Sequence, residues 1–128
     1  MFNDGARKAG KAAGDAAETL ALGWLQARGL VLVERNYRVA RGPRAHGGEV
    51  DLIVRDRDGT LVFVEVRRRS SRCGGGAAAS ITAAKRRSLV LAAQHFLSRF
   101  ATPPACRFDV VAIDGAHIEW LRGAFDAA

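Results

Sequence analysis

Two apolar segments near the middle of the chain alternate with charged residues at every second position. The first covers residues 48–54 and the second covers residues 61–67, with aspartate and glycine between them at 56–59. Alternation with a period of two is typical of half-buried β-strands, and aspartate and glycine are common turn residues. The pattern predicts a β-hairpin.

Register decides which side chains of this hairpin meet. Placing the apolar residues of both strands on one face requires Leu52 to oppose Val64, because directly opposed residues share a face. That face then carries Val50, Leu52, Val54, Val62, Val64 and Val66. The same register places Asp51 opposite Glu65 on the other face, with their Cβ atoms about 5 Å apart.

Helical spacing of apolar residues predicts two helices. The first covers residues 12–28, with Gly29 as its stop, and the second runs from Ser80 or Thr82 to about Phe100. The stripe of the first is Ala17, Leu20, Ala21, Trp24 and Leu25. That of the second is Leu89, Ala92, Ala93, Phe96 and Phe100.

Three more apolar runs predict strands at residues 30–39, 107–113 and 117–121. The element order is then α-β-β-β-α-β-β. A hairpin followed by a helical crossover favours an α/β fold, a mixed sheet with helices packed on it. Residues 1–11 and 123–128 are expected to be loose, and residues 69–80, rich in glycine and alanine, to form a flexible loop.

Length and charge narrow the class of protein. A chain of 128 residues with 48% apolar composition suits one domain with a single core. The net charge of +7 favours an anionic partner such as nucleic acid or a membrane surface, and the alternative is a generally basic proteome. Because the basic residues are clustered, nucleic acid is preferred.

Cysteine usage and hydropathy indicate a cytoplasmic protein. Cys73 and Cys106 have neither zinc-ligand spacing nor the pattern of a disulfide framework. No apolar run approaches the roughly 20 residues that a membrane span requires, and the N-terminal segment lacks the apolar core of a signal peptide. We therefore expect free thiols and no membrane partner.

The opposed acids of the hairpin suggest metal chemistry. Two carboxylates a few ångströms apart disfavour each other's ionised form unless a cation lies between them, and oxygen ligands suit Mg²⁺ or Mn²⁺. Arg67 follows Glu65 on the same face, so Asp51, Glu65 and Arg67 form an acid, then acid-x-arginine, pattern. Such a site can hydrolyse a phosphodiester. The alternative is a set of salt bridges that joins Arg67 to Glu49 and Glu65.

Basic residues flank these acids. Four arginines lead out of the second strand of the hairpin, at Arg67, Arg68, Arg69 and Arg72. The first turns of the second helix carry Lys85, Arg86 and Arg87, where cations oppose the helix dipole. Guanidinium groups bind phosphate well, so we expect these residues to contact nucleic acid, although a run of charges is often merely solvated.

Four segments of the sequence together resemble a known family. They are residues 14–18, 47–53, 62–69 and 106–112, which read GDAAE, GGEVDLI, VFVEVRRR and CRFDVVA. In this combination the chain resembles the YraN-type family of bacterial proteins over residues 14–125. That family in turn resembles archaeal Holliday-junction resolvases and the wider restriction-endonuclease-like nucleases.

The resemblance implies a restriction-endonuclease-like fold and a set of site residues. Glu18, Asp51 and Glu65 match the metal-binding acids, although helical spacing alone favours a solvated surface position for Glu18. Arg67 stands where these nucleases usually carry lysine, and arginine is the poorer proton-transfer group. Lys85 could take the place of that lysine if it reaches the site, and the alternative is an ordinary phosphate-contacting lysine.

Three functions remain open at this point. The first is a metal-dependent endonuclease that acts on branched or otherwise structured DNA, with Mg²⁺ or Mn²⁺ as cofactor and Glu18, Asp51, Glu65 and Arg67 as catalytic residues. The second is a nucleic-acid-binding module with the same fold and little or no catalysis. The third is a structural domain whose hairpin charges are only salt bridges. The resemblance to resolvases also implies a homodimer.

Overall fold

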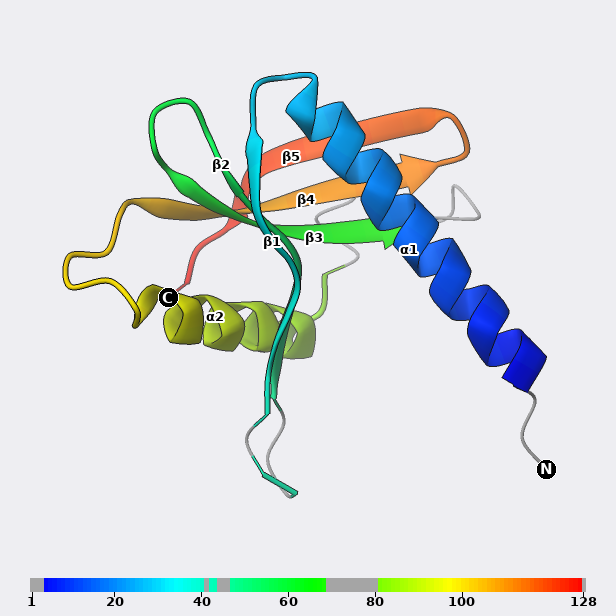
Figure 1. Ribbon diagram of the computed structural model, residues 1–128, viewed down its shortest axis with the longest axis horizontal. Helices are drawn as coiled ribbons and strands as arrows, with labels where there is room; N and C mark the ends of the chain where they lie inside the picture. Colours follow the sequence, from blue (N-terminus) through cyan, green and yellow to red (C-terminus); the bar gives the residue numbers. More distant parts are fainter. Residues whose placement is uncertain (1–3, 41, 44–46, 69–80, 128) are drawn as a thin grey trace.

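The computed structural model describes residues 4–40, 42–43, 47–68 and 81–127, with the backbone alone for residues 4–13 (Figure 1). Its elements are α1 (Asp4–Gln26), β1 (Val31–Val39), β2 (Gly48–Arg55), β3 (Leu61–Arg68), α2 (Ala83–Leu97), β4 (Cys106–Asp114) and β5 (His117–Phe125). The strands form one sheet in the order β1-β2-β3-β4-β5, in which only β3 and β4 are parallel. The predicted α/β class, mixed sheet and element order are confirmed.

Two element boundaries differ from the prediction. Helix α1 begins at Asp4 and not near residue 12, because alanines through this segment favour helix strongly enough to outweigh its glycines. Strand β5 continues past residue 121 to Phe125, whose ring stacks on Phe108 of β4 at a centroid distance of 4.9 Å. Residues 123–125 are therefore strand and not a loose tail. The predicted loop at 69–80 lies outside the described residues.

Each face of the sheet is covered by one helix (Figure 1). Helix α1 packs on one face through Ala21 and Leu25, against Leu52 and Val64. Helix α2 packs on the other through Leu89, Ala92, Ala93 and Phe96. Ile53 and Phe63, which lie on the predicted acid-bearing face of the hairpin, therefore pack under α2. In the described part of the chain, neither helix is long and apolar enough to cross a membrane.

Helix α2 rests directly on the backbone of β2 at Gly48. A Cβ atom on Gly48 would lie 2.6 Å from the backbone nitrogen of Ala92 and 2.9 Å from the carbonyl oxygen of Ser88. Neither backbone atom can move aside without shifting the helix. Glycine is needed here because the helix approaches the strand more closely than any side chain permits.

The predicted register holds from Arg55 to Leu52 of β2, next to the turn, and ends at Leu52. Leu52 pairs with Val64 and Val54 with Val62, as expected, but no ladder pair follows toward Gly48. From there β2 pairs with β1 alone. We call the place where β2 leaves β3 the fork.

The strand alternation is interrupted at the fork. Val50 packs in the cluster under α2, whereas Leu52 packs under α1, so the prediction that they share one face is wrong. Asn36 of β1 lies between the partners of these two residues and has φ of 56°, in the left-handed region that asparagine tolerates better than most side chains. The irregular backbone opposite Asp51 accounts for the change of face.

A second buried acid joins β4 to β5. The carboxylate of Asp109 accepts hydrogen bonds from Arg107 Nε at 3.0 Å, Trp120 Nε1 at 2.9 Å and the backbone nitrogen of Gly123 at 2.9 Å. Gly123 lies where the β4–β5 register shifts and has φ of 59°. Arg107 also pairs with Asp56, Nη2 to Oδ2, at 2.9 Å. Asp109 thus supplies the acceptors that this irregular strand pair requires.

We predict that Asp109→Ala lowers the free energy of unfolding by about 3 kcal/mol, because it removes the acceptor that Arg107 Nε, the Trp120 indole and the Gly123 backbone amide share. Urea denaturation followed by circular dichroism measures the change. The exposed strand residue Glu119 supplies the control, since Glu119→Gln should shift stability by less than about 0.5 kcal/mol. Equal stability of the two variants would show that the Asp109 network is dispensable.

Candidate functional site

Asp51 and Glu65 meet at the fork. In place of a ladder bond at this position, Asp51 Oδ2 accepts a hydrogen bond from the backbone nitrogen of Val66 at 2.8 Å. Glu65 is held on the other side by β4, where it pairs with Val110, and only 2% of its surface is exposed. The negative charge of Asp51 raises the pKa of Glu65, so the two carboxyl groups lie close together. The predicted juxtaposition of these acids is therefore present, although a side chain and not the ladder sets it.

Burial raises the pKa of Glu65. Loss of solvation is the main cause, and the negative charge and hydrogen bond of Asp51 add to it, so that the pKa of Glu65 rises to about 8. Lys85 acts in the opposite direction but does not cancel the rise. Two carboxyl groups this close together cannot both ionise cheaply unless a cation lies near them.

Two cations lie against the outer side of Glu65. Lys85 Nζ is 3.4 Å from Glu65 Oε2, and Arg67 Nη1 is 3.7 Å from the same oxygen. The predicted pair of Arg67 with Glu65 is present. Glu49 pairs instead with Lys85 at 3.9 Å and with Arg38 at 3.3 Å. The predicted Glu49–Arg67 opposition is wrong, because β2 has already left β3 and Glu49 faces Arg38 of β1.

Glu18 approaches the same acids from α1. Its side chain is only 13% exposed, so the solvated position that helical spacing favoured is wrong. Burial is the first cause of its raised pKa and the charge of Asp51 is the second. Its Oε1 atom is buried and has no hydrogen-bond partner within the described part of the chain. The third acid therefore lies close enough to Asp51 for their charges to interact.

Arg35 holds Glu18 in place. The sequence alone did not indicate this role for Arg35. Its Nε lies 3.5 Å from Glu18 Oε1, and its Nη2 donates to the carbonyl oxygen of Asp15 and to Thr19 Oγ1, both at 2.8 Å. These contacts tie β1 to α1. Arg35 is one of several arginines in a basic chain, and only the packing of α1 on β1 distinguishes it.

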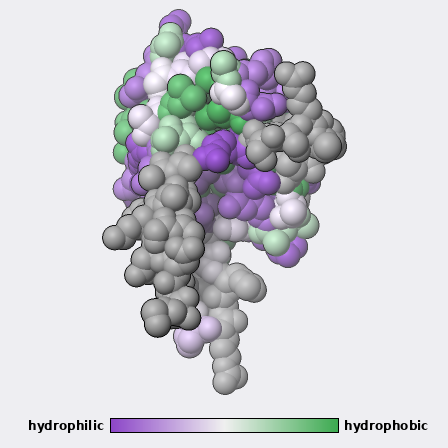
Figure 2. Space-filling view, turned by 90° about the vertical axis from the view of Figure 1, so that its right-hand side faces the viewer, coloured by the Kyte–Doolittle hydropathy of each residue, from purple (hydrophilic) through white to green (hydrophobic). Residues whose placement is uncertain are grey.

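An open groove of about 560 Å³ runs beside Glu18, between α1 and β1. Its lining residues are Gly14, Asp15, Glu18, Asn36 and Arg38. Figure 2 shows a patch of hydrophilic residues on this side of the molecule, below a more apolar region. A polar ligand can therefore reach the neighbourhood of the carboxylates.

The donor set fits a hard divalent cation at Asp51 and Glu65. Carboxylate oxygens are the ligands that Mg²⁺ and Mn²⁺ prefer, and two of them touch here. Among the residues that the structure describes, no three acidic, histidine or cysteine side chains lie close enough to hold a metal ion together. The assignment of Glu18 as a third ligand stays a prediction.

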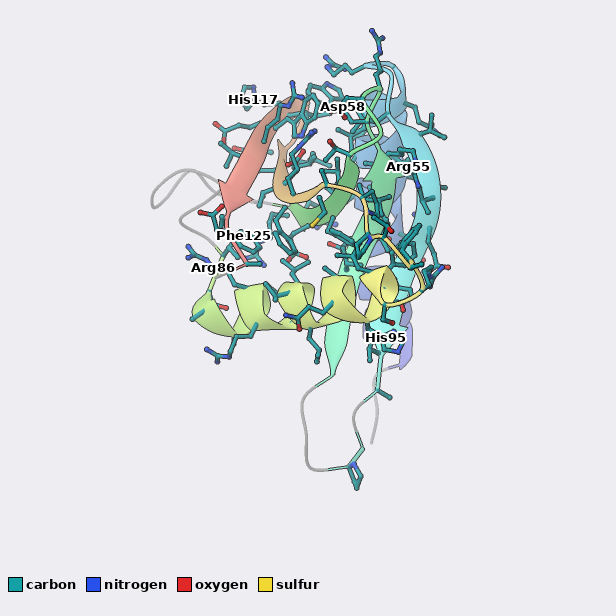
Figure 3. The ribbon with its side chains drawn as sticks, turned by 90° about the vertical axis from the view of Figure 1, so that its left-hand side faces the viewer. Arg55, Asp58, Arg86, His95, His117 and Phe125 are labelled. Atoms are coloured by element: carbon teal, nitrogen blue, oxygen red, sulfur yellow. The ribbon has the colours of Figure 1, made fainter. Side chains whose placement is uncertain are left out.

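The predicted basic strip divides into two surfaces. Arg67 and Lys85 lie at the carboxylates, and Arg68, which follows on β3, is exposed. Arg86 instead lies over the ring of Phe125 at 5.5 Å, and Figure 3 shows these two side chains together between α2 and the end of β5. Arg87 lines the same groove as Arg86. Arg69 and Arg72 lie outside the described residues.

Acids and bases balance around the fork. The carboxyl groups are those of Glu18, Glu49, Asp51 and Glu65. The cations paired with members of this set are Arg35, Arg38, Arg67 and Lys85. The four negative and four positive charges cancel when all the groups are ionised, and the raised pKa of Glu65 shifts this balance toward positive charge. The site is therefore suited to an anionic ligand.

Comparison with known proteins places these residues in a family context. Residues 17–113, which include every acid and base of the fork, match the model of the family described as Uncharacterised protein family UPF0102. A UPF0102 protein of Methylibium petroleiphilum is 64% identical over 92% of this chain and 97% of its own length. A UPF0102 protein of an Acidovorax species is 60% identical over 92% of this chain and 87% of its own, and one of Ralstonia pickettii is 58% identical over 89% and 90%.

We predict that Glu65→Gln changes how stability depends on pH. The folded-state pKa of Glu65 lies above the unfolded value near 4.5, so its stabilising contribution is complete at low pH and is lost as pH rises toward about 8. In EDTA, the variant should therefore gain on the order of 3 kcal/mol relative to wild type between pH 5 and pH 8. Urea denaturation at the two pH values measures this, with Glu119→Gln as control. Parallel pH profiles for Glu65→Gln and wild type would contradict a raised pKa.

Proposed function

We propose that this chain, which belongs to the UPF0102 family, is a metal-dependent endonuclease acting on structured or branched DNA. The observation that carries the proposal is the Asp51–Glu65 carboxyl pair at the fork, in which Glu65 is buried and has two cations on its outer side. A pair that served only to stabilise the fold would not keep two acids in contact, because each raises the cost of ionising the other.

The reaction is hydrolysis of a phosphodiester. A water oxygen forms a bond to phosphorus, one ester P–O bond breaks, and the proton lost by the water goes to solvent or to the leaving oxygen. Mg²⁺ or Mn²⁺, when bound, polarises the phosphate and lowers the pKa of a water. In this proposal Asp51 and Glu65 hold that ion, and Glu18 supports it from α1.

Arg67 has the chemistry of a phosphate-binding group in this arrangement. It is partly exposed and lies 3.7 Å from Glu65, so its guanidinium lies at the boundary between the buried acid and solvent. A guanidinium can hold two phosphate oxygens at once. Arg67 would therefore contact the phosphate that enters the site, and Arg68 beside it would contact the backbone further along.

The choice of DNA as substrate rests on the net charge of +7 and on the likeness of the sequence to Holliday-junction resolvases. Resolvases cut two strands, so a homodimer in the cytoplasm is part of the same proposal. Arg69, Arg72, Arg86 and Arg87 belong to it as further contacts to nucleic acid. Arg86 and Arg87 would bind a different part of the DNA from Arg67, since they line a separate groove.

A second candidate is a nucleic-acid-binding module without catalysis. Two observations favour it, namely arginine in place of the usual lysine at position 67 and a third acid that is not close enough to complete a three-ligand site among the described residues. Both candidates use the same basic surface, so only their response to metal ions separates them.

We predict that Asp51→Asn and Glu65→Gln each reduce Mg²⁺- or Mn²⁺-dependent cleavage by at least about 100-fold, because each replaces a charged ligand with a neutral one. The assay uses four-way junction and flap DNA under single-turnover conditions. Glu119→Gln, an exposed acid-to-amide change on β5, should cleave within twofold of wild type. Unimpaired cleavage by both fork variants would place any activity elsewhere.

We also predict that the chain binds junction DNA with an affinity that falls steeply with salt, because phosphate contacts release counterions. Fluorescence anisotropy between 50 and 200 mM salt, with and without EDTA, measures this. Affinity that is the same in EDTA, together with no cleavage in Mn²⁺, would favour the binding module. Absence of binding at the lowest salt concentration would contradict both candidates.

A further inference from the structure

Lys85 reaches the acids of the fork from a different element than the Glu-x-Arg motif. It lies in the first turn of α2, and its Nζ is 3.4 Å from Glu65 Oε2 and 3.9 Å from Glu49 Oε1. The backbone nitrogen of Lys85 donates to Thr82 Oγ1 at 3.1 Å, the N-cap interaction of the helix. The N-cap of α2 therefore fixes the position of the Lys85 backbone.

The path of Lys85 is also fixed by how α2 meets β2. Because Gly48 has no side chain, the backbone of α2 at Ser88 and Ala92 lies directly against β2. Its first turn is thus held beside the fork. Arg86, the next residue, points away toward Phe125, so the helix directs a single cation of this turn to the acids.

Two cations on one buried carboxyl group are more than that group needs for neutrality. Lys85 and Arg67 both approach Glu65 Oε2, at 3.4 and 3.7 Å, although this acid carries at most one negative charge. Both side chains are about one-third exposed, at 32% and 36%. They lie where the buried acid meets solvent, which is where an incoming anion would arrive.

The two cations differ in what they can do there. The ammonium group of Lys85 is a compact charge with three donors, so it can stay in contact with Glu65 and still donate to a phosphate oxygen or to a water. The guanidinium of Arg67 is planar and is used best when both oxygens of one phosphate face it. Contact with acid and substrate together therefore suits Lys85 better.

We propose that Lys85 is a catalytic residue that contacts the phosphate group bound at Asp51 and Glu65, in the role that the resembling nucleases give to the lysine of their acid-x-lysine motif. Arg67 then binds a neighbouring phosphate. This assignment rests on the proposed nuclease function. It removes the difficulty posed by arginine at position 67, since the lysine is supplied by α2 and not by β3.

The experiment compares Lys85→Met and Lys85→Arg with Arg57→Met. Arg57 lies in the exposed turn between β2 and β3, at the opposite end of the hairpin from the fork, so Arg57→Met removes the same charge without touching the site. The first readout is the salt dependence of four-way junction binding in EDTA. Lys85→Met should reduce the slope of log K against log salt by about 0.9, the value of one phosphate contact, and Arg57→Met should leave it unchanged.

The second readout is the single-turnover cleavage rate with saturating protein in Mn²⁺. Lys85→Met should lower that rate by about 100-fold, and Lys85→Arg should recover part of the loss by keeping the charge. Arg57→Met should cleave within twofold of wild type. A Lys85→Met rate within threefold of wild type would overturn the catalytic role.

The two readouts separate this proposal from the function on which it rests. If wild type binds the junction but does not cleave it, the nuclease function is wrong, and the slope alone decides whether Lys85 contacts phosphate. An unchanged slope in Lys85→Met overturns the contact whether or not wild type cleaves. Thermal unfolding of each variant shows that a lost contact is not a lost fold.

Discussion

The contact between the carboxyl groups of Asp51 and Glu65 is the interaction on which the arrangement of this site depends. It forms where β2 leaves β3, on the Gly48 side of Leu52, and Glu65 stays buried there because β4 continues to pair with β3. Burial alone would protonate a lone glutamate, and a lone aspartate at a strand end would be solvated. Together they form a pair that needs either a proton or a metal ion. Basic residues lie close to this site. Arg35 pairs with Glu18 of α1, and Lys85 pairs with Glu65.

The two buried acids of the sheet show how differently the same chemical group can be accommodated. Asp109 is surrounded by donors, with a guanidinium, an indole and a backbone amide all directed at its carboxylate. Glu65 faces another acid and two cations that keep contact with solvent. The first arrangement satisfies its carboxylate completely and joins two strands. In the second arrangement the partners of the carboxyl group are partly exposed side chains, which a ligand can displace, as a binding site requires.

Much of the fold and part of the site could be predicted from the sequence. Strict alternation in β2 and β3 was enough to set Leu52 against Val64 and to bring Asp51 near Glu65, because an apolar face tolerates no slip. Glu18 and Arg35 could not be placed this way, since the packing angle of α1 on the sheet is a tertiary property. Val50 and Glu49 were assigned wrongly for a related reason. A prediction from a periodic pattern assumes that the strands pair along their whole length. The residue types around Asn36 do not indicate that the β2–β3 ladder ends at Leu52.

The fork also gives the site a mechanical character that a regular ladder would not have. Opposed side chains within a ladder are held at a fixed spacing by backbone hydrogen bonds on both sides of them. At the fork, the backbone nitrogen of Val66 in β3 donates a hydrogen bond to the Asp51 side chain. A side chain can rotate, whereas the backbone of a ladder cannot. The separation of the two carboxyl groups is therefore compliant. A change of rotamer at Asp51 alters that separation and leaves every ladder bond of the sheet intact.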